Sequence, residues 1–234
     1  MLPLPASDQI AELAVLNSDQ VLARVGESLT ERGWWVGDNA VAPDLVGELK
    51  AELEVLRAAD ELQRAGIGRD LDWQLAERIR RDRIHWLSRS SPVQMRLLDQ
   101  MEALRLTLNR ELFLGLFEFE AHFAHYPPGA FYRRHLDSFR GAANRIISTV
   151  IYLNEDWRED DGGELLLYPP EQDHSMSSGT VTEMTRIAPV AGRLALFLSE
   201  EIPHEVLTAR RDRYSIAGWF RLNASLGNQI DPPR

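Results

Sequence analysis

The hydrophobic pattern of the chain changes its period at about residue 116. Before this point, apolar residues recur every three or four positions, as they do along one face of an amphipathic helix. After it, short runs rich in β-branched and aromatic residues alternate with a period of two, and glycine, proline and aspartate separate the runs. The sequence therefore predicts an α+β fold, in which N-terminal helices pack on one face of a β-barrel-like core.

Helical periodicity is clearest in three stretches of the first half. These are residues 7–15, 42–65 and 91–112. A proline near the start of the second and third stretches suits the first turn of a helix, and Ser91 suits the N-cap of the third. Gly66 directly follows the second stretch and predicts that this helix ends there.

The remaining elements are extended. Residues 69–90 are ambiguous, and we expect a short helix or an extended arm that ends in a strand around residues 84–87. The later runs that predict strands are residues 116–126, 144–154, 162–169, 192–198 and 213–222. No internal repeat and no linker rich in Pro, Gly or Ser divides the chain. We therefore expect residues 1–234 to form a single domain, with 1–115 mainly helical and 116–223 forming the β core.

Composition excludes several classes of function. A formal net charge of −10 argues against a protein that binds nucleic acid through its phosphates, and it disfavours binding to anionic membranes. The chain has no cysteine, so any metal must be bound by histidines and carboxylates. The N-terminus lacks the basic and apolar regions of a signal peptide, and no apolar run reaches about 18 residues. The expected location is the cytoplasm.

Three residues form a candidate metal site. His135 and Asp137 lie two positions apart, so on a strand or a strand end their side chains project to one face. His204 follows the strand-like run 192–198 and is the third candidate. Two histidines and one carboxylate form the facial triad of non-haem Fe(II) oxygenases, which leaves positions open for substrate and O₂. The alternative is an unrelated pair of histidines and a turn aspartate, because this spacing alone is common.

Arg213, nine residues after His204, favours the metal-site interpretation. On the strand predicted there, Arg213 shares one face with Ser215, Ala217 and Trp219. A buried guanidinium is costly unless it meets an anion, and its planar fork suits a carboxylate. These residues therefore predict a pocket for a small dicarboxylate that chelates iron at one end and meets Arg213 at the other.

Several segments occur in an order that resembles the 2-oxoglutarate- and Fe(II)-dependent prolyl hydroxylases related to the hypoxia-inducible-factor enzymes. They are IRRDRIHWL, HYPPGAFYRRHLD, RIISTVIYLNEDW, GGELLLYP, PHEV and RYSIAGWF. The resemblance extends from about residue 66 to 222 and is strongest to bacterial members, whose known protein substrate is elongation factor Tu. It implies a double-stranded β-helix, the jelly-roll-like or cupin-like barrel of these enzymes, supported by the N-terminal helices.

The resemblance also implies roles for individual residues. The iron ligands would be His135, Asp137 and His204. The far carboxylate of 2-oxoglutarate would pair with Arg213 and accept a hydrogen bond from Tyr152, and Tyr126 would line the same pocket. The residues that would shape the opening for a substrate proline, or lie on the segment that folds over it, are Tyr132, Arg145, Trp219, Arg80 and Asp82.

The implied activity is that of a peptidyl-proline 4-dioxygenase, with Fe(II), 2-oxoglutarate and O₂ as cofactors and co-substrates. It would decarboxylate 2-oxoglutarate to succinate and CO₂ and hydroxylate a prolyl residue of a protein, with elongation factor Tu as the expected partner. Oxygen sensing depends on the apparent affinity for O₂, which no motif encodes. Two alternatives stay open: a related oxygenase acting on another side chain or a small molecule, and a catalytically inactive binding module of the same fold.

Two departures from the animal enzymes concern substrate choice. The turn before Tyr132 contains PPGAF and is one residue shorter, and the segment between Gly163 and His204 is longer. The extra residues, around 171–180, are polar and predict a loop. This loop either helps to select the protein substrate or is a loop tip without a binding role.

The other histidines have simpler interpretations. His122 and His125 are expected on opposite faces of a strand, His85 in a structural or rim position, and His174 in the polar loop. Tyr152 and Trp219 also suit a purely structural role in the core. Arg210 and Arg211 are rivals of Arg213 as the anion anchor, but their position beside Asp212 is typical of a solvated, charged turn.

Overall fold

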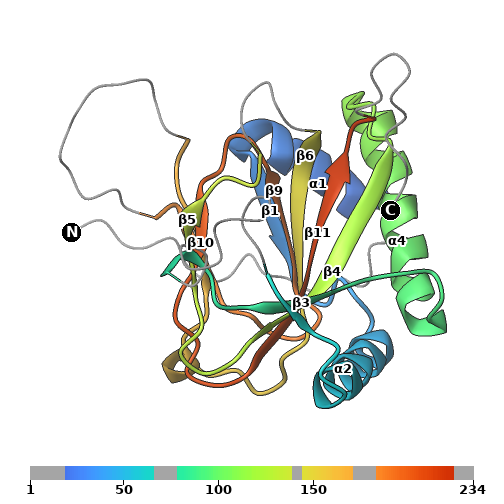
Figure 1. Ribbon diagram of the computed structural model, residues 1–234. Coiled ribbons are helices and arrows are strands. Elements are labelled where there is room, and N and C mark those ends of the chain that lie inside the picture. Colours follow the sequence, from blue (N-terminus) through green and yellow to red (C-terminus); the bar gives the residue numbers. More distant parts are fainter. Residues whose placement is uncertain (1–18, 66–77, 139–143, 171–182, 224–234) are drawn as a thin grey trace, which may run out of the picture.

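Two antiparallel sheets face each other in the computed structural model, which describes residues 19–65, 78–138, 144–170 and 183–223 (Figure 1). The larger sheet has the order β1-β9-β6-β11-β4-β3-β2. Its strands are β1 (Trp34–Gly37), β2 (Gln63–Arg64), β3 (Arg83–Trp86), β4 (Glu118–Tyr126), β6 (Arg145–Tyr152), β9 (Leu194–Leu198) and β11 (Arg213–Arg221).

The smaller sheet has the order β5-β10-β7-β8. Its strands are β5 (Tyr132–His135), β7 (Leu165–Leu167), β8 (Thr185–Ile187) and β10 (His204–Val206), and a short 3₁₀ helix, η1 (Glu159–Asp161), precedes β7. Two facing antiparallel sheets of this kind form the double-stranded β-helix that the family resemblance implies. The open end of such a barrel is a common place for a ligand site.

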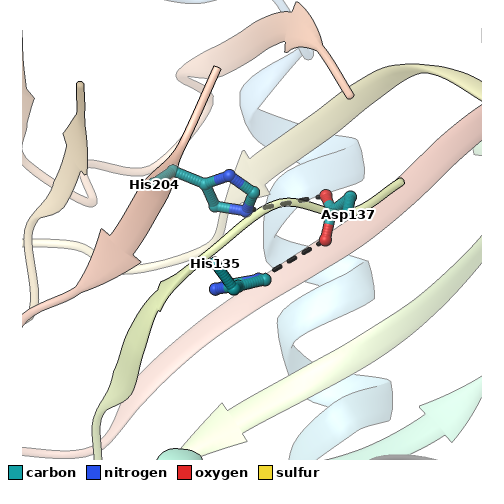
Figure 2. A group of neighbouring side chains, drawn as sticks. All are labelled: His135, Asp137 and His204. Carbon is teal, nitrogen blue, oxygen red and sulfur yellow. Dashed lines mark ion pairs between the residues drawn. The ribbon is translucent and has the colours of Figure 1, made fainter. Parts of the chain in front are cut away.

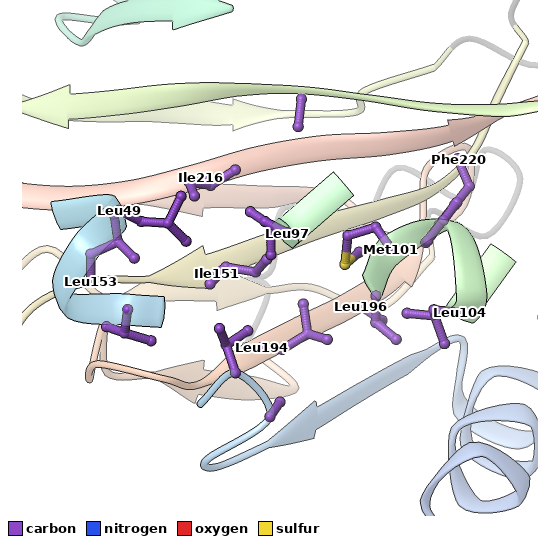
Figure 3. Packing of buried hydrophobic residues seen from close by; sticks show 14 of the residues in the cluster. Leu49, Leu97, Met101, Leu104, Ile151, Leu153, Leu194, Leu196, Ile216 and Phe220 are labelled. Atoms are coloured by element: carbon purple, nitrogen blue, oxygen red, sulfur yellow. The ribbon is translucent and has the colours of Figure 1, made fainter. Parts of the chain in front are cut away.

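The helices pack against the outer face of the larger sheet, where they form the main apolar core. They are α1 (Asp19–Arg32), α2 (Pro43–Ala58) and α4 (Pro92–Leu112). Figure 3 shows Leu97, Met101 and Leu104 of α4 and Leu49 of α2 close to residues of the sheet. The residues labelled there on the sheet are Ile151, Leu194, Leu196, Ile216 and Phe220, and Leu153 directly follows β6. None of the described helices is both long and apolar enough to cross a membrane.

A second apolar cluster lies between the two sheets. Strand β9 shows how the two clusters are separated, because Leu194 and Leu196 face the helices while Ala195 and Phe197 face the smaller sheet. Alternation along a strand therefore gives the larger sheet one face for packing and one face that lines the barrel. The inner face carries the functional residues described below.

The structure confirms some of the predicted elements and corrects others. Helix α4 begins after Ser91, whose Oγ accepts a hydrogen bond from the Gln94 amide, and β3 occupies the predicted strand near residues 84–87. The prediction that the second helix reaches Gly66 is wrong, because α2 ends at Ala58. Leu62 is buried in the core beyond that end, and β2 then pairs with β3.

Helix α1 was not predicted, although Val21, Val25 and Leu29 recur at helical spacing and are buried. The sequence predicts a helix at residues 7–15 instead, because a capping residue there precedes apolar residues at helical spacing. That segment, the first part of the ambiguous region up to residue 77, and the loop at 171–180 lie outside the described residues.

Candidate active site

His135, Asp137 and His204 converge at the inner side of the smaller sheet (Figure 2). His135 ends β5 and His204 begins β10, and the two residues are direct partners in the antiparallel pairing of these strands. Asp137 follows β5, and its two carboxylate oxygens lie 3.4 Å from His135 Nε2 and 3.6 Å from His204 Nε2. One ligand atom from each residue lies within 4.8 Å of the other two.

Backbone carbonyls orient both imidazole rings. The Nδ1 atom of His135 lies 2.8 Å from the carbonyl of Arg133, and that of His204 lies 3.1 Å from the carbonyl of Ile202. A carbonyl oxygen only accepts, so Nδ1 donates in each case and Nε2 is the ring nitrogen that faces Asp137. Burial lowers the pKa of His204 to about 4, although Asp137 opposes this effect, so the ring is neutral near pH 7.

Asp137 is ionised and held in position by two donors. Ser148 Oγ and Trp219 Nε1 both donate to Oδ2, at 2.6 Å and 2.9 Å, and Ser199 donates to Ser148 in turn. Burial acts to raise the pKa of Asp137, but His204, His135 and Ser148 together lower it well below its ordinary range. The carboxylate is therefore negative at neutral pH.

This donor set suits a divalent cation. Two imidazole lone pairs and a carboxylate face one another, which is repulsive unless a positive charge lies between them. Nitrogen and oxygen donors in a two-histidine, one-carboxylate set are those of non-haem Fe(II) sites. The carbonyls and hydroxyls that orient the three side chains are the outer contacts expected around a metal site.

Arg213, at the start of β11, is a buried cation that is not paired with an anion in the part of the chain that the structure describes. It is 1% exposed, and no carboxylate of the described residues pairs with it. Its Nε donates to the Gly163 carbonyl at 2.7 Å and Nη1 donates to Ser215 Oγ at 3.1 Å, but Nη2 has no partner. Gly163 has a φ of 68°, and a Cβ there would lie 3.0 Å from Arg213 Cδ, so a glycine suits this close approach.

A second polar atom without a partner lies beside this guanidinium. The Tyr152 hydroxyl is buried and unpaired, and its ring lies 5.2 Å from Arg213 Cζ. Burial raises the pKa of Tyr152 to about 12 despite Arg213, so the hydroxyl keeps its proton and can donate. Buried polar groups are rarely left unsatisfied, so an unpaired guanidinium nitrogen and an unpaired hydroxyl together indicate a site for a carboxylate.

One cavity of about 200 Å³ connects the anion site with the histidine–aspartate cluster. The strands of the larger sheet contribute Arg213, Ser215, Ala217 and Trp219 to its wall. Their neighbours on β11, Tyr214, Ile216 and Phe220, face the helices instead, as the sequence predicts. The arrangement can bind a small dicarboxylate between a cation at one end and Arg213 at the other.

Comparisons with known proteins agree with this geometry. Residues 121–221 match the profile of the 2OG-Fe(II) oxygenase superfamily. A crystal structure of a Pseudomonas putida prolyl-4-hydroxylase has 43% sequence identity and a TM-score of 0.73, and the match covers 87% of this chain and 100% of that chain. The chain belongs to the 2OG-Fe(II) oxygenase superfamily.

Further similarities place this oxygenase beside the prolyl hydroxylases. A Trichoplax adhaerens prolyl hydroxylase, solved with a fragment of the hypoxia-inducible-factor oxygen degradation domain, is 26% identical with a TM-score of 0.74, covering 86% of this chain and 89% of that one. The hypoxia-inducible factor prolyl hydroxylase of Caenorhabditis elegans is 28% identical over 226 residues, which are 90% of this chain but 30% of that protein. The superfamily uses Fe(II), 2-oxoglutarate and O₂, which the donor set and the anion site of this oxygenase accommodate.

The mouth of the oxygenase cavity is aromatic and cationic. Trp219 lies under the Arg145 guanidinium, whose Cζ is 3.6 Å from the ring centroid, and Arg145 pairs with Glu120 at 2.8 Å. On the other side, Tyr132 stacks on the His135 ring at 3.6 Å between centroids. Tyr126, deeper in the cavity, lies 4.8 Å from Arg213 Cζ, and burial raises the pKa of its hydroxyl above the ordinary value.

Arg80 and Asp82 have different positions. Arg80 lines the cavity, with its Cζ 4.4 Å from the centre of the Tyr132 ring. Asp82 is buried and does not line the cavity; it accepts two hydrogen bonds from Arg80, at 2.7 Å and 2.5 Å. Asp82 is therefore placed to hold Arg80 in position, not to touch a ligand.

Reasoning from the sequence missed several residues of the cavity wall, among them two with aromatic rings beside Trp219. Trp86, on β3, and His122, on β4, meet edge to face with ring centroids 5.2 Å apart, and both approach Trp219. The position of His122 could have been predicted, because it shares one face of its strand with Ala124 and Tyr126 at a spacing of two residues. Trp86 gave no signal, because the short β3 carries no clear alternation.

Among the described residues, His85, His125, Arg210 and Arg211 lie as expected. His125 faces away from the cavity, where Nε2 lies 2.6 Å from Asp212 and the ring stacks on Tyr214. His85 contacts the Glu61 carbonyl, and His174 lies outside the described residues. Arg210 and Arg211 donate to backbone carbonyls of a surface turn, so neither competes with Arg213.

Proposed function

We propose that the protein is an Fe(II)- and 2-oxoglutarate-dependent prolyl hydroxylase that acts on a protein substrate. The observation that carries this proposal is a pair of unsatisfied buried groups: Arg213 Nη2, on a residue that lines the cavity with the three facing donors, and Tyr152 Oη, on the residue beside Arg213. A cation site alone would suit many metalloproteins. A cation site and a carboxylate site in one small cavity suit a chelating keto acid.

In this proposal, His135, Asp137 and His204 hold the ferrous ion, and Ser148 and Trp219 keep the carboxylate of Asp137 in the required orientation. Arg213 and Tyr152 bind the far carboxylate of 2-oxoglutarate, and the Tyr126 ring lines the same pocket. The buried Arg213 is fixed in advance by Gly163 and Ser215, so little reorganisation is needed when the co-substrate binds.

When bound, iron and 2-oxoglutarate supply the oxidation: O₂ is consumed, 2-oxoglutarate becomes succinate and CO₂, and one oxygen atom enters a C–H bond of the substrate. The protein positions the substrate and excludes water. Trp219 and Arg145 on one side, and Tyr132 with Arg80 on the other, form an opening suited to the compact, apolar ring of a proline. This opening supports a prolyl substrate over a charged or extended side chain.

The partner we propose is elongation factor Tu, in the cytoplasm. The support is the resemblance of the sequence motifs to bacterial members of the family, together with the similarity to the Pseudomonas putida prolyl-4-hydroxylase. The curated relative from Caenorhabditis elegans is more than three times as long as the matched region, since the match covers 30% of it. Its substrate is therefore a weaker guide than the bacterial similarity.

The test is to incubate the purified protein with elongation factor Tu, Fe(II), 2-oxoglutarate and air. The expected result is a one-oxygen gain on a single proline, detected by mass spectrometry, together with an equal amount of succinate. Succinate formation with a small molecule, but with no proline-containing protein or peptide, would assign the site to a different oxygenase. Repeating the assay over a range of O₂ concentrations measures the affinity on which any oxygen-sensing role depends.

A binding-module alternative has its own test. Anaerobic addition of Fe(II) and 2-oxoglutarate is expected to give a weak visible charge-transfer band, because the keto acid chelates the metal. The band should be absent from the His135→Ala variant. A wild-type protein without this band would be a binding module that keeps the fold without the chemistry.

A further inference from the structure

A second cavity lies next to the active site and shares a wall with it. Its volume is about 320 Å³, and Trp86 lines both cavities. The apolar part of its wall comes from Leu87 after β3, Leu98 on α4, and Phe117 and Phe119 at the start of β4. Phe117 is 43% exposed and Trp86 is 39% exposed, so the cavity opens to the surface.

One edge of this cavity is the open edge of a strand. β4 pairs with β11 along its whole length, but β3 covers its other edge only from His122 to His125. The last contact is the hydrogen bond from the Leu87 amide to the Ala121 carbonyl, at 2.9 Å. After it, the chain turns toward α4, and the Ser88 amide donates to the side chain of Gln94.

Strand geometry decides which groups of β4 face this cavity. In an antiparallel strand, the amide and carbonyl of every second residue point to the same edge. Because Ala121 bonds with Leu87 at this edge, Phe119 directs its own amide and carbonyl to the same side, beyond the end of β3. Among the described residues, no strand pairs with β4 at that point. An edge of this kind is where an extended peptide can add a strand.

We propose that this second cavity binds the extended segment of the protein substrate that flanks the target proline. The inference rests on the proposed function and adds a specificity site to it. The segment would pair with the backbone of Phe119 and place an apolar side chain against Leu87, Leu98 and Phe117. Trp86, as the shared wall, makes the path from the proline opening to this cavity continuous.

The distance between the two cavities fixes the position of the recognised side chain. Phe119 and His122, the latter at the proline opening, lie three positions apart on β4. At about 3.3 Å per residue, they span about 10 Å, which a peptide covers with about three residues. The structure therefore assigns a preference for an apolar residue two or three positions from the hydroxylated proline.

The charges around the second cavity support an apolar, not a charged, side chain. Glu102 pairs with Arg105, and Glu120 pairs with Arg145 and Arg221. Arg89 pairs with Asp99. Glu118, the remaining charged residue of the wall, pairs with Arg221. Each charged group of the wall thus has a partner outside the cavity, and a substrate charge placed there would gain little.

The test uses short peptides with one central proline. Leucine is placed two or three residues before or after the proline, and the matched peptides carry serine at the same position. Affinity for protein loaded anaerobically with Fe(II) and 2-oxoglutarate is measured by calorimetry, so no turnover is needed. We expect leucine on one side of the proline to strengthen binding about tenfold, because one side chain is removed from water.

Two variants of α4 locate the effect. Leu98→Gln should abolish the gain from leucine, since the side chain would face an amide. Leu106→Gln is the matched control, because Leu106 lies on the same helix, is 56% exposed and does not line the cavity; it should retain the full gain. Leu98 is outside both buried core clusters, so the substitution is compatible with folding.

Three results would overturn the inference. Equal affinities for leucine and serine peptides would show that the cavity recognises nothing near the proline. An unchanged leucine gain in Leu98→Gln would place the recognition elsewhere. If sedimentation experiments detect a dimer, and the Leu98→Gln substitution dissociates it, the cavity binds a second copy of the chain instead of a substrate peptide. The charge-transfer band measured without peptide reports the active site separately, so failure here and failure of the proposed function are distinguishable.

Discussion

Alternate residues of β11 face two different environments. Tyr214, Ile216 and Phe220 pack under the helices in a continuous apolar core, whereas Arg213 and Trp219 line the barrel. The barrel face holds a buried cation, Arg213, that pairs with no carboxylate of the described residues. One strand thus supplies stability on one side and binding on the other, and single substitutions can separate the two properties.

The largest expected effect is on the inner side, at the histidine–aspartate cluster. His135→Ala removes one of three donors, so metal binding and turnover should both be lost. The fold should remain, because His135 belongs to neither apolar cluster. Metal content by mass spectrometry and succinate formation are the measurements, and thermal unfolding is the control. Normal turnover in this variant would refute the assignment of the three donors.

Arg213→Met tests the inner face of β11 itself. A co-substrate carboxylate would lose its charged partner, which costs about 2–5 kcal/mol of binding free energy. The KM for 2-oxoglutarate should therefore rise strongly. The unliganded protein should unfold at an equal or higher temperature, since an unpaired buried charge has been removed. A lower Tm together with an unchanged KM would make Arg213 a structural residue.

Leu196→Ala tests the opposite, packed face of the same sheet. Leu196 is fully buried against α4, and its truncation should cost about 2–5 kcal/mol of unfolding free energy. Chemical denaturation measures this loss. The KM for 2-oxoglutarate, measured well below the Tm, should stay within error of the wild-type value. A large rise in KM would show that the two faces are coupled.

Tyr152→Phe should have a smaller effect on the inner face. The variant loses one hydrogen bond to a charged carboxylate, worth about 1.5–3 kcal/mol. The measurement is the 2-oxoglutarate titration of the charge-transfer band. Because the hydroxyl is unpaired without the co-substrate, Tm should not fall in the unliganded variant. A marked loss of stability would indicate a partner for the hydroxyl within the protein.

The smallest expected effect is at His122, where a substitution should change how the stability of the fold depends on pH. Burial lowers its pKa from 6.5 to about 4, so between these values the unfolded chain binds a proton that the folded chain excludes. Stability therefore falls as the pH decreases through this window. Through this residue, the wild-type protein should lose about 1 kcal/mol of unfolding free energy between pH 6.5 and 5.5. The His122→Met variant should not show this loss. Denaturation curves at both values test this, and identical pH dependence in variant and wild type would contradict it.

Much of the inner face could be predicted from the sequence, because strand alternation is a strict geometric rule. The faces of β11 and the opposite orientations of His122 and His125 follow from it. The structure brings His135, Asp137 and His204 together as the sequence suggested. Their role as metal ligands stays a prediction, as do the roles of the pocket residues.

The parts that were not predicted depend on tertiary contacts. Periodicity extended the second helix to Gly66, but burial of Leu62 and the pairing of β2 with β3 end α2 at Ala58. The place of Trp86 beside Trp219 depends on the pairing of β3 with β4, which no local pattern specifies. The buried position of Asp82 under Arg80 has the same origin, since both lie on a segment with weak local signals.

Trp219 has a consequence for how such a protein could change its substrate during evolution. Its indole forms part of the opening, and its Nε1 also holds the carboxylate of Asp137. A mutation at this position would alter the shape of the entrance and the chemistry of the centre at once, so selection acts on both. Trp86 and His122 also shape the cavity beside Trp219, and divergence of specificity would therefore proceed through them.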